Sequence, residues 1–588
     1  MTTPKNLAFY NRFLLLVAGL GGLLYGIDVG IIASALPYLQ ATSGINSDET
    51  SHIVAAVLLG SVISTLFAGL LADWMGRKWL MAASGVLFVV SIPVIALSHG
   101  YDFLIIGRLL QGLSAGLIGV VVPLYLAECL TAANRGRGTG LFQWLLTFGI
   151  CVAAFIGIYF SKRVAAVESL GDPARLFAFK DSAWRSIFWV SLPPGVLFVI
   201  GSLVIAESPR WLHRRGRRTA ARAALLRSCP EAEADLEMAE MDRVAEAEKA
   251  KASQGGPGAK ESLLRRKYVI PFVLACVILA CNQATGINSI IGYNTNILLQ
   301  AGLSDVQAHW GYVILTLVNF LMTMVGVTLV DRRGRKFLLS VGSAGIIVSL
   351  VAVGLTFRAT ERQRVEAREA VQAAVSPDQS LSLRFDSAAA GRLLSGPGAA
   401  IAGRPSTLIV IYSYGAFRAA TSVARSDDPA GAPVTITRDG CVPANKVIAF
   451  FSNPFGDLDA ARLAPLRIEN ALVTPVPSEA HGKLTAFFTF AFIACFAAGP
   501  GVCVWLALSE LMPTRIRSNG MSIALLINQA VSTAIAGKFL PMVGRYGYAT
   551  VFFAFAAFTV VYFITAAFFL PETKGKTLEE IERHFEGA

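Results

Sequence analysis

Long apolar segments recur along the chain and set the first expectation for its fold. About twelve of them are long enough to cross a bilayer as helices. They lie near residues 12–38, 52–72, 79–98, 102–127, 138–160, 185–206, 268–299, 308–330, 337–357, 484–509, 517–541 and 548–570. The alternating pattern of a membrane β-barrel is missing. The pattern therefore predicts an all-α membrane protein with twelve transmembrane helices.

The polar segments between these stretches repeat in the two halves of the chain. GLLADWMGRKWL after the second span matches VTLVDRRGRKFL after the eighth, and PLYLAECLTAANRG after the fourth matches ALSELMPTRIRS after the tenth. AESPRW and PETKGK follow the sixth and twelfth spans in the same way. The repeat predicts two pseudo-symmetric six-helix bundles related by duplication.

The offsets between the repeats show where extra residues were inserted. We expect an N-terminal bundle at 1–206, a cytoplasmic linker of short helices at 207–267, and a C-terminal bundle at 268–357 and 483–588. Between spans nine and ten, 358–482 forms an extracytoplasmic insertion. A helix is expected from Arg358 over about eighteen residues, with short strands at Ser406–Tyr412 and Val434–Thr437. The sequence assigns this insertion neither a role nor a protein partner.

Composition agrees with a membrane protein. Of 588 residues 54% are hydrophobic and 15% charged, and the mean hydropathy is +0.58. The net charge of +12 lies mostly in loops that alternate with Lys- and Arg-free loops, which places both termini in the cytoplasm of a multi-pass protein of the plasma or inner membrane. The basic loops lack interleaved aromatics, which argues against nucleic acid as a partner. No catalytic triad, metal cluster or phosphate loop is recognisable, so we expect no enzyme activity, cofactor or metal.

The seventh span is the most polar of the apolar segments. It contains CNQATGINSIIGYN, Cys281–Asn294. Gln283 and Asn288 are five residues apart, so both reach one ligand only in a wide cleft or where the helix loosens near Gly286. Several uncharged amides favour a site for a neutral, hydroxyl-rich ligand. Polar contacts between packed helices are the alternative.

One acidic residue, Asp28, lies inside the first span, and Arg108 opens the fourth as its best basic partner. A buried carboxylate must be paired or protonated. The pair is either a static link between spans one and four or a proton relay, and we favour the relay.

Charged side chains recur at the cytoplasmic ends of both halves. They predict a latch that pairs across spans when the outside is open; the alternative is solvated loop charge of little energetic value. The predicted latch residues are Asp73, Arg77, Glu128, Arg135, Glu207, Arg210, Asp331, Arg335, Glu510 and Arg517.

Together these motifs resemble the sugar porter family of the major facilitator superfamily. The matching stretches are GLLADWMGRK, LVDRRGRK, PLYLAECLTAANRG, ESPRWL, NQATGIN and PETKGK, in the family's order and at its positions. The resemblance covers nearly everything except the insertion and the first few residues, and it is closest to bacterial proton-coupled sugar symporters. It implies two bundles around a central cavity and sugar transport by alternating access.

The resemblance also implies which side chains contact the sugar. They are Gln143, Gln283, Asn288, Asn319 and Trp505, with Tyr25 as an aromatic near the site and Tyr293 as part of the outer gate. Two positions depart from the family pattern. Asn282 stands where the family has the first of two glutamines, and Gln529 follows the amide Asn528 where the family has tryptophan.

The combined expectation is a secondary active transporter for a monosaccharide, a hexose or pentose, coupled to protons. Its partners are the sugar or a polyol, protons and the lipid bilayer. Two alternatives stay open: a passive sugar or polyol uniporter, and a transporter-like nutrient sensor whose insertion binds a partner. An acid at position 28 argues against the uniporter.

Overall fold

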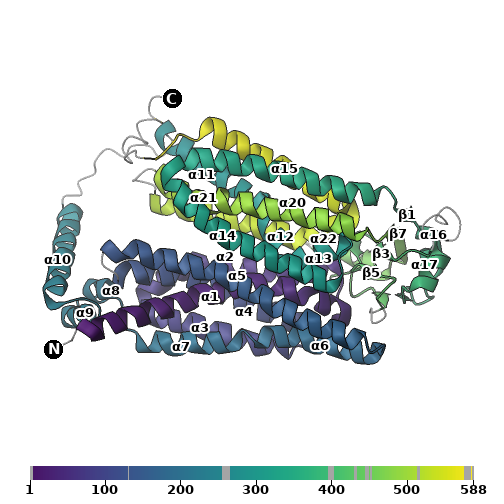
Figure 1. Ribbon diagram of the computed structural model, residues 1–588, viewed down its shortest axis with the longest axis horizontal. Helices are drawn as coiled ribbons and strands as arrows, with labels where there is room; N and C mark the ends of the chain where they lie inside the picture. The colour runs from purple at the N-terminus through teal and green to yellow at the C-terminus, as the bar shows by residue number, and fades with distance from the viewer. Residues whose placement is uncertain are drawn as a thin grey trace.

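Two groups of long helices lie side by side in the computed structural model (Figure 1). The structure describes residues 4–129, 132–253, 265–394, 403–428, 433–443, 446, 449, 453, 455–512, 517–574 and 585. The short helices α8, α9 and α10 lie at one end of the groups, and the strands lie at the other. We call these the linker end and the insertion end.

The first half of the chain forms the lower group in Figure 1, coloured purple to blue. Its seven described helices are α1 (Pro4–Ser43), α2 (Ser47–Met75), α3 (Arg77–Ala96), α4 (Tyr101–Cys129), α5 (Ala132–Glu168), α6 (Pro173–Trp189) and α7 (Leu192–Val204). Asn46 caps α2 by accepting a hydrogen bond from the Glu49 backbone N–H, and the Glu49 side chain returns a bond to Asn46.

The second half forms the upper group, coloured teal to yellow in Figure 1. Its helices are α11 (Arg266–Ala284), α12 (Ile287–Gly292), α13 (Asn294–Gln300), α14 (Asp305–Arg333), α15 (Arg335–Glu361), α20 (Glu479–Ala498), α21 (Pro500–Leu511) and α22 (Arg517–Ile564), which a π-helical turn, Thr565–Phe569, continues. The two groups contact each other through α2 with α22 and through α5 with α14.

Among the described residues, 11 helices are long and apolar enough to cross a membrane. The last of them, Ile523–Phe569, has 47 residues, and its length of about 70 Å is more than twice the thickness of a hydrocarbon core. The backbone inside it is not helical at Gly547, where φ is 87° and ψ is 161°. This break in the helix divides the long segment into two parts. Residues other than glycine rarely adopt this conformation, which explains the glycine at this position.

Between the halves, the linker forms α8 (Pro209–Arg214), α9 (Arg218–Leu225) and α10 (Glu231–Ser253). The insertion contains β1 (Val365–Glu366), α16 (Arg368–Ala373), β2 (Leu381–Leu383), α17 (Ser387–Leu393), β3 (Ser406–Tyr414), β4 (Phe417–Ala420), β5 (Ala424–Arg425), β6 (Val434–Ile436), α19 (Leu458–Leu463) and β7 (Leu466–Pro475). Strands β3 and β6 lie where the sequence predicted strands. The long helix expected from Arg358 is wrong, because α15 ends at Glu361 and β1 intervenes before α16.

The insertion has its own hydrophobic core. One antiparallel sheet has the order β1-β7-β3-β4 with β5 also paired to β3, and β2 pairs with β6. Both ends of this subdomain are continuous with the second half, through α15 and α20. It also contacts the first half: the Ser47 hydroxyl donates to the Thr421 carbonyl at 2.6 Å, and Lys180 pairs with Asp428 at 3.1 Å. The insertion therefore spans the two groups of helices at one end.

Candidate functional site

The polar seventh segment is broken in the middle. Helix α11 ends at Ala284 and α12 begins at Ile287. Between them Gly286 adopts the left-handed conformation with φ of 82°, and a Cβ there would overlap the ring of Phe555 at 2.3 Å. Only glycine meets both conditions. The helix is therefore interrupted near Gly286, as it must be for Gln283 and Asn288, five residues apart, to face the same side.

The break brings the two amides into contact. The Asn288 Nδ2 donates to Gln283 Oε1 at 3.0 Å and to the Ser532 hydroxyl at 2.7 Å. Gln283 Nε2 in turn donates to Asn528 Oδ1 at 3.2 Å, and Asn528 Nδ2 donates to the Leu279 carbonyl at 3.0 Å. We call Gln283, Asn288, Asn528 and Ser532 the amide cluster. It joins the broken seventh segment to α22.

Gln283 and Asn288 are more accessible to solvent than their neighbours in the seventh segment. Every residue from Cys281 to Leu298 is buried except Gln283 and Asn288, which are half-buried. Asn528 and Ser532 are buried behind them. Both bonds of Asn288 use its Nδ2, so its carbonyl oxygen takes no part in them. The cluster thus presents an amide oxygen toward accessible space, where it can accept a hydrogen bond from a hydroxyl.

Asn282 behaves differently from Gln283. Its side chain is buried, and its Nδ2 lies 3.4 Å from the Tyr562 hydroxyl of α22. No hydrogen bond links it to the amide cluster among the described residues. The geometry favours helix packing for this side chain over contact with a ligand.

Other residues predicted to bind sugar lie on neighbouring helices. Gln143 is exposed on α5, and Asn319 is buried on α14. Their neighbours Trp144 and Phe320 pack with ring centroids 5.3 Å apart, which brings these parts of the two helices together. Neither amide bonds to the amide cluster within the described part of the chain.

The three aromatic residues of the prediction have separate surroundings. Tyr25 is half-buried on α1. Tyr293 is fully buried; its hydroxyl donates to the Ala536 carbonyl at 3.1 Å and its ring stacks on Phe539 at 4.7 Å. Trp505 belongs to α21, but its side chain lies outside the described residues.

The acid of the first span and the arginine of the fourth are close together and buried. Arg108 Nη1 lies 3.7 Å from Asp28 Oδ1, and neither carboxylate oxygen has a hydrogen-bond partner in the described part of the structure. The same Nη1 donates instead to Gln111 Oε1 at 2.6 Å, and the guanidinium lies over Phe188. An ionised carboxylate without donors is costly to bury, so this arrangement suits a carboxyl group that gains and loses a proton.

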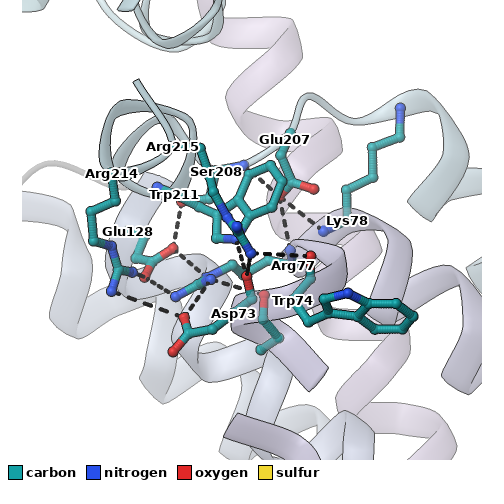
Figure 2. A network of polar contacts seen from close by, with 11 residues as sticks. Asp73, Trp74, Arg77, Lys78, Glu128, Glu207, Ser208, Trp211, Arg214 and Arg215 are labelled. Carbon is teal, nitrogen blue, oxygen red and sulfur yellow. Dashed lines mark hydrogen bonds and ion pairs between the residues drawn. The ribbon is translucent and has the colours of Figure 1, made fainter. Parts of the chain in front are cut away.

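A dense network of charges lies at the linker end (Figure 2). Arg77 is buried, and its guanidinium contacts both oxygens of Glu128 at 2.8 and 2.9 Å and Asp73 at 2.9 Å. The Ser208 hydroxyl also donates to Glu128. These residues come from α2, α3, α4 and the start of the linker, so the network ties together elements of one half.

Glu207 caps a helix within this network. Its carboxylate accepts from the backbone N–H groups of Arg77 at 2.9 Å and Lys78 at 3.1 Å, at the start of α3. Burial raises the pKa of Glu207, while these N–H donors oppose the rise. A helix N-terminus stabilises an anion. Gly76 completes the turn with φ of 94°, and a Cβ there would strike the Glu207 carboxylate.

One predicted latch residue of this half is placed elsewhere. Arg210 pairs with Glu237 of α10 at 3.8 Å, whereas Arg214, one turn later, binds Glu128 at 2.9 Å. In this structure Arg214, which the sequence did not single out, contacts Glu128, and the assignment of Arg210 to the latch stays a prediction. The two positions lie on one helix face in sequence, so only the docking of α8 decides which arginine reaches Glu128.

The second half repeats the helix cap. Glu572 accepts from the backbone N–H groups of Arg335 at 3.0 Å and Lys336 at 3.2 Å, at the start of α15. Gly334, with φ of 86°, corresponds to Gly76. The set of predicted latch residues missed Glu572, although the matching of AESPRW with PETKGK indicated its position. The side chains of Arg135, Asp331, Glu510 and Arg517 lie outside the described residues.

A cavity of about 970 Å³ lies at the insertion end. Its lining comes from both halves and the insertion, and includes Tyr38, Asp305, Arg425 and Asp428. None of the four residues of the amide cluster lines it. This cavity is therefore separate from the amide cluster.

Comparison with known proteins agrees with the motifs. The family model described as sugar (and other) transporter matches residues 14–375 and 467–585, which leaves out most of the insertion. The glucose transporter GlcP of Staphylococcus epidermidis is 30% identical over 347 residues, 59% of this chain and 72% of GlcP. The proton myo-inositol cotransporter hmit-1.1 of Caenorhabditis elegans is 26% identical over 604 residues, 99% of this chain and 91% of the relative.

A solved structure has the same fold. The xylose transporter XylE from E. coli in its inward-open conformation aligns with a TM-score of 0.62 at 19% identity, over 97% of this chain and 98% of XylE. The family predicted from the motifs is confirmed. The chain belongs to the sugar transporter family of the major facilitator superfamily, whose members are multi-pass membrane proteins.

Proposed function

We propose that this protein moves a monosaccharide, a hexose or pentose, across the membrane by alternating access and in symport with protons. One observation carries the proposal: in a long buried stretch, only Gln283 and Asn288 keep accessible surface, and they are joined to each other. Neutral amides supply both donors and acceptors, as a polyhydroxylated ligand requires. Gln143, Asn319, Trp505, Asn528, Tyr25 and Tyr293 complete the proposed site.

The proposed architecture is twelve spans in two pseudo-symmetric bundles, with the turn at Gly547 separating spans eleven and twelve. The paired caps made by Glu207 and Glu572 support a duplication, because they contact equivalent backbone positions. The linker end faces the cytoplasm, because the basic loops gather there. The insertion then lies outside the cell membrane.

Proton coupling is assigned to Asp28 and Arg108. Asp28 takes a proton when its 3.7 Å contact with Arg108 opens and loses it to the cytoplasm. One charge crossing 100 mV releases about 2.3 kcal/mol, and one pH unit adds about 1.4 kcal/mol. Together they support an accumulation of about 500-fold.

Uptake by reconstituted protein tests this function. Proteoliposomes are given a panel of hexoses, pentoses and polyols, with and without an imposed pH gradient. We expect accumulation of at least one sugar that collapses when the gradient is removed. The Asp28→Asn variant should exchange labelled sugar without accumulating it, and the exposed Asp102→Asn should behave as wild type.

Three outcomes would contradict the proposal or part of it. Transport of no saccharide or polyol by folded protein would refute the transport function and favour a sensor. Accumulation by Asp28→Asn equal to that of the wild type would refute the assigned relay, and transport indifferent to the gradient would favour a uniporter.

A cyclic polyol is a second candidate substrate. The worm relative named as a proton myo-inositol cotransporter aligns over 99% of this chain, the insertion included. Gln529, polar where the family has tryptophan, also removes an apolar wall that would suit a sugar ring. Competition of myo-inositol against labelled hexose and pentose uptake separates the two substrates.

A further inference from the structure

A histidine lies buried in the seam between the two halves at the insertion end. His309, on the second turn of α14, has no exposed surface. The ring of Tyr38 from α1 stacks on it with centroids 5.5 Å apart and planes 6° apart. Gly157 of α5 lets the imidazole approach, because a Cβ there would lie 3.2 Å from its Cδ2. The imidazole of the second half is thus enclosed by two helices of the first.

Both ring nitrogens face carbonyl oxygens. Nδ1 lies 2.9 Å from the backbone oxygen of Asp305, and Nε2 lies 3.3 Å from the backbone oxygen of Ser34 on α1. A carbonyl oxygen can only accept. A neutral imidazole has one N–H, so either tautomer directs a lone pair at one of these oxygens. Only the imidazolium donates to both.

One carboxylate lies beside the imidazole. The Asp305 carboxylate lies 3.5 Å from Nδ1. Its Oδ2 accepts from the Tyr38 hydroxyl at 2.8 Å and from the Ser161 hydroxyl of α5 at 2.5 Å. The carboxylate is held by three helices and still keeps 28% of its surface exposed, in the cavity at the insertion end. The carboxylate therefore connects the buried imidazole with the cavity.

The other charged groups near this seam are engaged or lie further out. Lys162 of α5 lies over the ring of Trp310, and Glu479 of α20 accepts from Gln307. Glu168 and Lys180 line the cavity beyond Asp305, and Lys180 pairs with Asp428 of the insertion. Within the described part of the chain, Asp305 is the only charged side chain placed against His309.

We propose that His309 is a second proton-binding site of this transporter, and that its imidazolium holds the insertion ends of the two halves together. The proton is taken up only while Ser34 and Asp305 are both in place, that is, while this end is closed. Acid at the insertion end therefore favours the closed arrangement. This inference rests on the proposed alternating access and adds a gate residue to it, distinct from Asp28.

Proton linkage fixes the size of the effect. If the closed state binds one proton more than the open state, the ratio of closed to open changes by up to about tenfold for each pH unit.

A distance measurement without substrate tests the proposal. Spin labels at Leu170→Cys in the first half and Lys483→Cys in the second report the opening of the insertion end in full-length protein in nanodiscs. We expect the open population to grow as pH rises in the wild-type background. His309→Gln should remove this dependence, because glutamine can donate to Ser34 but does not titrate. His481→Gln, an exposed histidine at the same end, should keep it.

A second variant covers the case in which His309→Gln fails to fold. Asp305→Asn still accepts from Tyr38 and Ser161 but removes the charge beside Nδ1, so the transition should move to lower pH. A wild-type distribution that ignores pH, a His309→Gln variant that keeps the dependence, or an unmoved transition in Asp305→Asn would overturn the proposal. If these results hold and proteoliposomes transport no sugar, only the proposed substrate fails.

Discussion

The hydrogen bond between Asn288 and Ser532 can decide whether the amide cluster binds a ligand or holds helices together. The bond is 2.7 Å long and joins α12 to α22. Either Asn288→Ala or Ser532→Ala deletes it. Asn288→Ala also deletes the bond to Gln283, so it should lose more stability than Ser532→Ala in either case. If the cluster only packs helices, the two variants should have the same effect on substrate affinity. If Asn288 also binds substrate, they should differ.

The expected difference follows from the bonds that each residue makes. A neutral hydrogen bond contributes about 1 kcal/mol net. Ser532→Ala should therefore lose stability of this order, and Asn288→Ala, which also loses its bond to Gln283, about twice as much. The carbonyl oxygen of Asn288 accepts no hydrogen bond from the described residues, and its Nδ2 can exchange its partners for hydroxyls of a ligand. Losing one or two such bonds costs about 1–2 kcal/mol, or about 5- to 30-fold in affinity. Ser532→Ala removes only a hydroxyl that competes with the ligand for Asn288 Nδ2. The affinity of this variant for substrate should therefore stay within about twofold of the wild-type value or improve.

Counterflow measures the substrate affinity of each variant, and thermal unfolding measures its stability. Half-saturation of counterflow, with the best-transported saccharide, reports affinity without a proton gradient, and a thiol-reactive dye reports unfolding at the eight free cysteines. Asn282→Ala is the matched control, because its amide bonds to Tyr562 and is buried. That variant should lose stability and keep its half-saturation.

Equal effects would refute the reasoning. If Asn288→Ala and Ser532→Ala shift the half-saturation of counterflow alike, the cluster is a packing contact. The same conclusion follows if Asn288→Ala changes half-saturation by less than Asn282→Ala does.

Three further predictions concern the charged contacts. Arg214→Ala should destabilise the linker-end network by up to about 1 kcal/mol and Arg210→Ala should not, as compared by thermal unfolding; the reverse order would restore Arg210 to the network. Glu572→Gln should cost about 1 kcal/mol by removing an anion from the start of α15, and no change in unfolding would exclude the cap. Lys180→Ala and Asp428→Asn should each increase labelling of a cysteine placed at the insertion end, and the double variant should add nothing; additive effects would show that the pair does not act as a unit.

The sequence predicted what depends on local pattern. The spans, the polar seventh segment and its loosening at Gly286 follow from hydropathy and from a five-residue spacing. The approach of Asp28 to Arg108 was expected because buried charges need partners, and the two lie 3.7 Å apart. Each of these predictions depends on the properties of a few residues and not on how the helices pack.

Contacts between residues far apart in the sequence could not be predicted in the same way. The partners of the amides, Asn528 and Ser532, come from a helix more than two hundred residues later. Whether Arg210 or Arg214 reaches Glu128 depends on how α8 docks. The pairing of His309 with Ser34 has no sequence signal at all, because it depends on a backbone oxygen in the other half.

The insertion gives the transport cycle a constraint that the two bundles alone would lack. It is covalently part of the second half, and its contacts with the first half involve the α1–α2 turn and α6. At the turn, Asn46 donates to the Gly440 carbonyl at 2.7 Å and Ser422 donates to the Ile45 carbonyl at 2.8 Å. These few polar bonds can be replaced by bonds to water at little net cost. Exposing the apolar core of the insertion to water would cost much more. In the proposed alternating-access cycle, the insertion therefore leaves the first half as a rigid body when this end opens, and it travels with the second half.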